Sequence, residues 1–226
     1  MKILLTCEHG GNVIPPGYTS LFRDGQAALN SHRGYDPGAL DLFHYLKNLA
    51  DYSYFSTTSR LLVELNRSIG HPKLFSEFTK SLSNKEKQHI MQKHYFLYRD
   101  EIEKVISREI ARGEKLLHIS VHTFTPVLNG EIRDTDIGLL FDPARALEKD
   151  FVRIWKFNMS KIAPSVKLRF NYPYLGRADG FTTYLRKKFP QNYMGIELEV
   201  NQSFCEGNKM AKKISNDLYL SLQQSL

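Results

Sequence analysis

The chain opens with a stretch that reads Leu4-Leu5-Thr6-Cys7-Glu8-His9-Gly10-Gly11-Asn12. The apolar residues at its start are typical of a buried strand, and the two glycines indicate the turn that leaves it. A carboxylate and an imidazole stand at the junction between strand and turn. In open α/β sheets the loops at strand ends meet in one crevice, and ligands bind there. We therefore expect the chemistry of this protein to begin at His9.

Two later stretches have the same form. Residues 116–123 are an apolar run that ends with His122, and residues 193–201 carry two carboxylates, Glu197 and Glu199. Shorter apolar runs that are typical of strands alternate with helical patterns along the rest of the chain. This alternation predicts a single α/β domain over residues 1–226, with a mixed, mostly parallel sheet and helices on both faces. The shorter predicted strands cover residues 52–57, 61–65, 137–141 and 166–170, and the predicted helices start near 36, 83, 142, 181 and 207.

Composition narrows the class of protein. The chain has 226 residues, 42% of them hydrophobic, and a formal net charge of +7. No nucleic-acid-binding motif accompanies this charge, so we expect no nucleic-acid partner. Cys7 and Cys205 lie far apart, which argues against a thiolate zinc cluster or a disulfide framework. The first apolar run is too short for a signal peptide or a membrane span, and we expect a cytoplasmic protein without membrane contact.

The strand-end histidines suggest a metal-assisted hydrolase. A catalytic zinc ion takes about three protein ligands and keeps one position open for water. His9 and His122 are the best candidates, because each lies where a strand meets a loop. Asp36 is a candidate third ligand, although Asp36-Pro37 is also a good helix start in which the carboxylate caps the helix. The other candidates are Asn12, Glu8, which we expect on the opposite strand face from His9, and Asp136.

A hydrolase also needs a base and a group that stabilises the oxyanion. Glu197 and Glu199 are two residues apart on a strand, so both should face the same side. Either is a candidate base, and the alternative is a solvent-facing stripe. Arg67, just past a predicted strand, is a candidate oxyanion stabiliser. Arg133 and Arg177 are candidates for binding a substrate carboxylate.

Taken together, these motifs resemble the N-formylglutamate amidohydrolase family, which is related to zinc carboxypeptidases and acylases. The resemblance runs over nearly the whole chain. It implies Zn²⁺ held by His9, His122 and Asp36, with Arg67 as the electrophilic arginine and Asn66 beside it in substrate binding. The motifs that carry it are Cys7-Glu8-His9-Gly10-Gly11-Asn12, Tyr35-Asp36-Pro37-Gly38-Ala39, Glu64-Leu65-Asn66-Arg67-Ser68, Ser120-Val121-His122-Thr123, Asp136-Ile137-Gly138, Asn171-Tyr172-Pro173-Tyr174 and Glu197-Leu198-Glu199-Val200-Asn201.

The resemblance implies hydrolysis of an N-acyl amide of an amino acid, such as N-formyl-L-glutamate, and a small anionic substrate. The formylglutamate pattern favours Glu199 as the base, whereas the carboxypeptidase pattern favours Glu197. Zinc carboxypeptidases have a glutamate three residues after the first histidine, where this chain has Asn12. Three alternatives therefore stay open: a metallocarboxypeptidase, another N-acyl amino-acid deacylase, and an inactive binding protein on the same fold.

Overall fold

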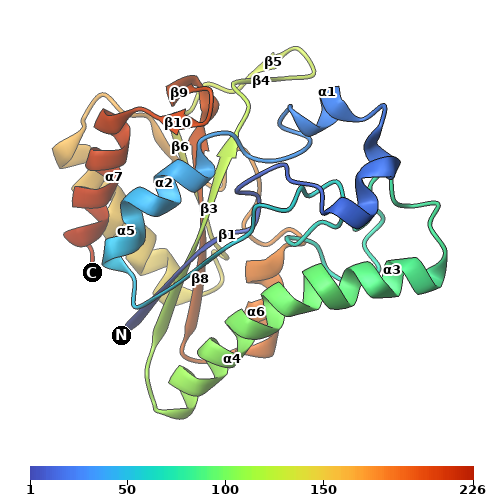
Figure 1. The fold of residues 1–226 in the computed structure, drawn as a ribbon. Helices are drawn as coiled ribbons and strands as arrows, with labels where there is room; N and C mark the ends of the chain where they lie inside the picture. The colour runs from blue at the N-terminus through green and yellow to red at the C-terminus, as the bar shows by residue number, and fades with distance from the viewer.

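The computed structural model describes residues 1–226 and centres on one six-stranded sheet in the order β2-β1-β3-β8-β6-β7 (Figure 1). Strands β1, β2, β3 and β8 run parallel, whereas β6 pairs antiparallel with β8 and parallel with β7. The predicted mixed, mostly parallel sheet is confirmed. The strands are β1 (Lys2–Cys7), β2 (Tyr52–Phe55), β3 (Leu116–Phe124), β6 (Ile137–Leu140), β7 (Leu168–Phe170) and β8 (Tyr193–Asn201).

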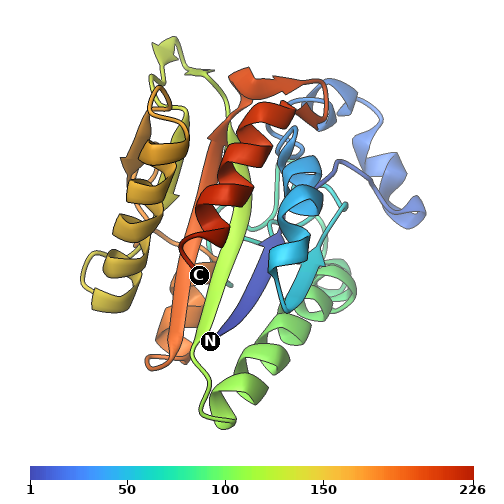
Figure 2. The same cartoon turned by 90° about the vertical axis from the view of Figure 1, so that its left-hand side faces the viewer.

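Helices cover both faces of the sheet, as predicted. Figure 2 looks onto one face, where three helices pack over the largest apolar core. Two helices cover the other face, where the rings of Phe181 and Tyr193 pack with Leu4 and Leu116. The first group is α2 (Ala39–Leu46), α5 (Ala146–Ile162) and α7 (Lys212–Gln223), and the second is α4 (Leu97–Ala111) and α6 (Phe181–Lys188).

The helical segment before β3 begins at Ser83, at the predicted helix start, with a capping box. Ser83 Oγ accepts a hydrogen bond from Glu86 N, and the Glu86 carboxylate accepts one from Ser83 N. Helix α3 (Asn84–Ile90) continues through a π-helical turn (Met91–Phe96) into α4. The turn contains Tyr95, whose hydroxyl donates to the backbone oxygen of Arg67 at 2.6 Å. This long helix therefore anchors the loop that carries Arg67.

The predicted strand over residues 61–65 is wrong. These residues form turns, although Leu61 and Leu62 are buried in a second apolar core. Their backbone groups bond locally, as Leu62 N does to Ser59 O, and not to a neighbouring strand. A short apolar run indicates burial, but its periodicity does not separate a strand from a buried turn.

The helix predicted to start at Asp36 begins later. Helix α2 starts at Ala39, and its N-cap residue Gly38 has φ +81° and makes no side-chain cap. Positive φ suits glycine, so Gly38 lets the chain turn sharply into the helix. The Asp36 carboxylate is thereby free for other contacts.

No helix of the structure is both long and apolar enough to cross a membrane. Short elements complete the fold. They are α1 (Gln26–Leu29), the 3-10 helices Pro16–Phe22, Lys47–Leu49 and Gln202–Phe204, and two small hairpins made of β4 (Val127–Leu128) with β5 (Glu131–Ile132) and β9 (Cys205–Glu206) with β10 (Lys209–Met210).

Candidate metal centre

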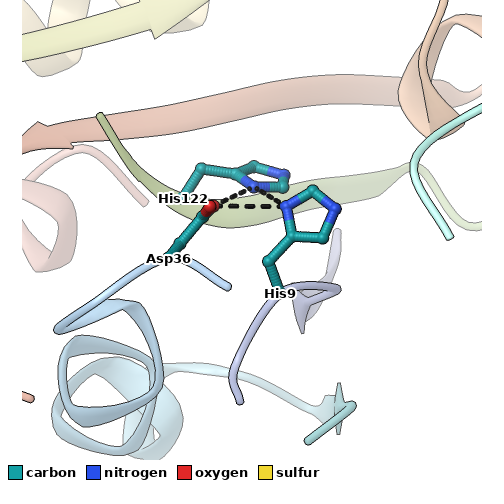
Figure 3. A group of neighbouring side chains, drawn as sticks. All are labelled: His9, Asp36 and His122. Atoms are coloured by element: carbon teal, nitrogen blue, oxygen red, sulfur yellow. Dashed lines mark hydrogen bonds and ion pairs between the residues drawn. The ribbon is translucent and has the colours of Figure 1, made fainter. Parts of the chain in front are cut away.

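His9, Asp36 and His122 converge at the carboxyl ends of β1 and β3 (Figure 3). Nδ1 of His9 lies 3.2 Å from Nδ1 of His122 and 3.2 Å from Asp36 Oδ2. Nδ1 of His122 lies 3.0 Å from the same oxygen. All three side chains are buried. The structure thus brings together the three residues that were predicted to be metal ligands.

The backbone around the first turn places His9 and Asp36. The chain leaves β1 at Cys7, and Gly10 N then donates to Ser56 O at 3.0 Å. A Cβ atom at Gly10 would lie 2.8 Å from that oxygen, so a side chain there would push the turn away. Asp36 N donates to His9 O at 2.9 Å. This bond joins two distant segments directly beneath the cluster.

Each histidine also has a partner on its outer nitrogen, Nε2. Glu64 Oε1 contacts Nε2 of His9, and Ser120 Oγ lies 2.8 Å from Nε2 of His122. Ser120 donates its single proton to Glu8 Oε2 at 2.5 Å, so towards His122 it accepts. A carboxylate also accepts. In the neutral, metal-binding form each imidazole would therefore carry its proton on Nε2 and turn its Nδ1 lone pair towards the cluster. Burial by itself would lower the pKa of His122, but without a cation the Asp36 and Glu8 carboxylates raise this pKa well above its usual range.

With both imidazoles neutral, three electron-pair donors lie within 3.2 Å of one another, an arrangement that a shared cation would stabilise. Zinc holds nitrogen and oxygen ligands at about 2.0–2.1 Å, so the ligand atoms of a tetrahedral site lie roughly 3.3 Å apart. The observed spacing is close to that value. Two imidazoles and one carboxylate, with a further position for water, also form a common catalytic zinc set. The residues therefore fit a zinc ion held by His9, His122 and Asp36.

Arg60 balances the negative charge around the cluster. Its guanidinium contacts Asp36 Oδ1 at 3.1 Å and Glu64 Oε2 at 2.7 Å. Burial by itself would raise the pKa of both carboxyls, but His9 and Arg60 bring each pKa well below its usual range. Both groups therefore remain ionised beside the histidines.

The two glutamates of β8 have different surroundings. Glu199 lies opposite His122 in the sheet, is 5% exposed, and has no hydrogen-bond partner on Oε2. Burial raises the pKa of Glu199 to about 8, although His122 opposes the shift. Glu197 accepts a 2.7 Å hydrogen bond from Thr182 Oγ1 and is half-buried. Glu199 is the carboxyl that remains free to exchange a proton.

A cavity of about 710 Å³ opens over the cluster. Its wall contains the three candidate ligands, both glutamates of β8, Asn66 and Arg67. Nη1 of Arg67 donates to the backbone oxygen of Asp179, and Asn66 Oδ1 accepts from Phe181 N at 2.6 Å. These bonds fix both side chains in the wall of the cavity. Such a volume suits a small organic ligand.

A model of the N-formylglutamate amidohydrolases matches residues 1–205 of this chain. The chain belongs to the N-formylglutamate amidohydrolase family. A solved gene product from Agrobacterium tumefaciens is 23% identical, with a TM-score of 0.82 over 99% of this chain and 90% of that one. An N-formylglutamate amidohydrolase from Ralstonia eutropha is 14% identical, with a TM-score of 0.71 over 100% and 94%. No curated protein matches the chain significantly.

Several residues that were predicted for this amidohydrolase-family site lie outside it. Arg177 is exposed and does not line the cavity. Arg133 does not line it either, but donates to the hydroxyl of Tyr174, a wall residue, at 3.1 Å. Asn12 bonds to Leu29 O and Asn30 Oδ1 and is not near the histidines. The structure therefore does not bring Arg133, Arg177 or Asn12 to the cluster, and the same is true of Asp136, which caps Lys167 N.

Sequence reasoning missed Arg60 and the role of Glu64. Glu64 lies in the segment that was expected to be a strand and Arg60 lies directly before it, and their contacts depend on the turn conformation of this segment. The Glu64-Leu65-Asn66-Arg67 motif was the available signal, because its glutamate directly precedes two candidate site residues. Glu8, considered as a metal ligand, lies behind His122 and outside the ligand cluster.

Proposed function

We propose that this chain is a zinc-dependent amidohydrolase that cleaves N-acyl amides of acidic amino acids, with N-formyl-L-glutamate as its substrate. Water would add to the acyl carbon and the C–N bond would break, giving formate and glutamate. The membership of the N-formylglutamate amidohydrolase family supports the reaction. The observation that carries the metal dependence is the set of three electron-pair donors spaced 3.0–3.2 Å apart beside the unpartnered Glu199 carboxyl.

His9, His122 and Asp36 would hold the metal. When bound, zinc would polarise the substrate carbonyl and lower the pKa of a coordinated water molecule to about 7. The outer partners of the ligands would hold both neutral histidines in the Nε2–H form, which leaves Nδ1 available for the metal. The protein thus supplies oriented ligands and charge balance around the reacting atoms.

Glu199 is the proposed base. Its free Oε2 would take a proton from the attacking water and hand it to the leaving amine. The cross-strand pairing with His122 places this carboxyl beside the cluster. Glu197 is already bonded to Thr182 and is the weaker candidate.

Arg67 is proposed to stabilise the oxyanion, and Asn66 to orient the substrate. Both line the cavity and both are fixed by backbone contacts from residues 179–181. Developing negative charge on the acyl oxygen is best met by a donor that is already in place, because no reorganisation is then needed.

The cationic part of the cavity wall supports an anionic substrate. Lys73 and Lys80 line the cavity and form no ion pair, whereas Arg33 is paired with Glu77. The free thiols Cys7 and Cys205 suit a reducing compartment, and we place the activity in the cytoplasm. No nucleic-acid or membrane partner is part of this proposal.

The test is a panel of N-acyl amino acids assayed with the purified protein, before and after removal of metal by a chelator. We expect about one zinc ion per chain, preferred hydrolysis of N-formyl-L-glutamate over its neutral amide analogue, and restored activity when zinc is returned. Cleavage of C-terminal residues from peptides instead would favour a metallocarboxypeptidase. Zinc binding without turnover of any substrate would favour a binding protein.

A further inference from the structure

The two candidate metal histidines are supported from behind by two different buried carboxylates. Behind His9, the Glu64 carboxylate forms an ion pair with the Arg60 guanidinium and accepts a hydrogen bond from Asn66 N at 3.0 Å. Behind His122 lies Glu8, which is fully buried and whose Oε2 is 3.3 Å from Nε2 of His122. The two supports therefore differ in how their charge is balanced.

Glu8 has no cation of its own. Its Oε2 accepts from the Ser120 hydroxyl at 2.5 Å, and its Oε1 accepts from the Tyr98 hydroxyl at 3.2 Å. A buried carboxylate is costly unless it is paired, and two neutral hydroxyls do not cancel its charge. The nearest group able to offset the Glu8 charge is the His122 imidazole, together with a cation bound to that imidazole.

The Ser120 hydroxyl links the carboxylate to the imidazole. Because Ser120 gives its only proton to Glu8, it can only accept from Nε2 of His122, at 2.8 Å. An uncharged amide in place of Glu8 can turn its NH₂ group towards Ser120. The Ser120 proton would then point at Nε2 of His122 and favour the Nδ1–H tautomer, which has no lone pair for a metal.

We infer that Glu8 is a positioning residue for the metal centre: through Ser120 it holds His122 in the Nε2–H tautomer, and its uncompensated charge strengthens zinc binding at Nδ1. Glu8 is not itself a ligand, because it lies on the far side of the His122 ring from Asp36. This inference rests on the proposed zinc site.

The decisive measurement is the zinc dissociation constant of the full-length protein, determined by competition with a chromophoric chelator. Glu8→Gln should weaken zinc binding about 10- to 100-fold, the range found when the outer partner of a metal-bound histidine is removed. The control is Glu109→Gln, a buried carboxylate on α4 that also accepts from a tyrosine hydroxyl, that of Tyr52, but is paired with Arg108 and Arg112 and lies outside the metal centre. Its zinc affinity should equal that of the wild type.

The thermal midpoint of the metal-free proteins is the second readout. A purely structural role for Glu8 would lower this midpoint and leave zinc affinity intact, and that result would overturn the inference. Equal losses of affinity in Glu8→Gln and Glu109→Gln would overturn it as well, since the effect would then not be local.

Ser120→Ala decides the matter if Glu8→Gln does not fold. It removes only the hydroxyl that joins Glu8 to His122, and should weaken zinc binding in the same direction by a smaller factor. Unchanged affinity in this variant would contradict the linkage. Failure of the wild-type protein to bind zinc would instead refute the proposed function, so the two failures are distinguishable.

Discussion

On the sheet face covered by α2, α5 and α7, strands β3 and β8 present mainly apolar side chains, among them Ile119, Val121 and Leu198. On the other face the same two strands present His118, Ser120, His122, Glu197 and Glu199. Side chains alternate with period two along a strand, so one register assigns both sets at once. The comparison shows that one face is devoted to the largest core, while the other combines a smaller apolar core with the candidate metal centre.

Position along the polar face separates fully hydrogen-bonded groups from those of the candidate metal centre. His118 precedes His122 by four residues on the same face of β3, and its ring nitrogens are paired with the neutral hydroxyls of Thr6 and Tyr193, each at 2.7 Å. At the level of His122 and Glu199, the inner nitrogen and one carboxyl oxygen have no neutral partner. Buried polar groups that are fully paired stabilise the fold, whereas those left available carry chemistry.

The largest expected effect comes from removing His122, a proposed zinc ligand. His122→Ala should abolish zinc binding and activity while the protein stays folded, because a two-ligand site holds zinc poorly. Elemental analysis and far-UV circular dichroism of the purified variant check this. A full equivalent of zinc in the variant would exclude His122 from the ligand set.

The second largest effect is expected from replacing the Glu199 carboxyl. Glu199→Gln should lower kcat at least about a hundredfold and keep its zinc, since a positioned acid–base group is lost while the ligands remain. Glu197→Gln is the matched control on the same strand face and should lose less than about tenfold. Steady-state kinetics with zinc analysis decide between them. An inactive Glu197→Gln variant alongside a working Glu199→Gln variant would reverse the assignment.

His118 should make the free energy of unfolding depend on pH. Burial lowers the pKa of His118 to about 4. Between about pH 6.5 and pH 4 the unfolded chain therefore binds a proton at His118 that the folded protein does not bind. Stability due to this group is therefore present above pH 6.5 and falls as the pH is lowered towards 4. Between pH 7.5 and 5, the wild type should lose about 2 kcal/mol more than His118→Gln.

Urea unfolding of metal-free protein at the two pH values checks this difference, because chelation removes any contribution from zinc release. Equal losses of unfolding free energy in the wild type and in His118→Gln would show that His118 is not kept neutral by its surroundings.

The smallest effect is expected on the apolar face. Ile119→Val should cost about 1 kcal/mol of unfolding free energy, because one buried methylene is lost from a packed core. Zinc content and kcat should stay at the wild-type values. A large drop in kcat for this variant would show that the two faces are not functionally separate.

Much of this arrangement was predictable from local patterns. The apolar runs around residues 2–7, 116–124 and 193–201 and the capping box at Ser83 specified elements that the structure contains. Alternation along β8 predicted that Glu197 and Glu199 share a face. Strand ends in an α/β fold meet in one crevice, so His9 and His122 were expected together. Asp36 was one of several candidate third ligands, and the family resemblance favoured it.

Only the tertiary structure decided the rest. The antiparallel pairing of β6, the turns at residues 61–65 and the late start of α2 depend on partners distant in the chain. The same long-range packing brings Arg60 and Glu64 to His9 and places Glu8 behind His122. It also separates Glu199, whose oxygen is buried without a partner, from Glu197, which Thr182 satisfies. Periodicity fixes which face a side chain occupies, but its partner and its ionisation depend on contacts that sequence spacing does not encode.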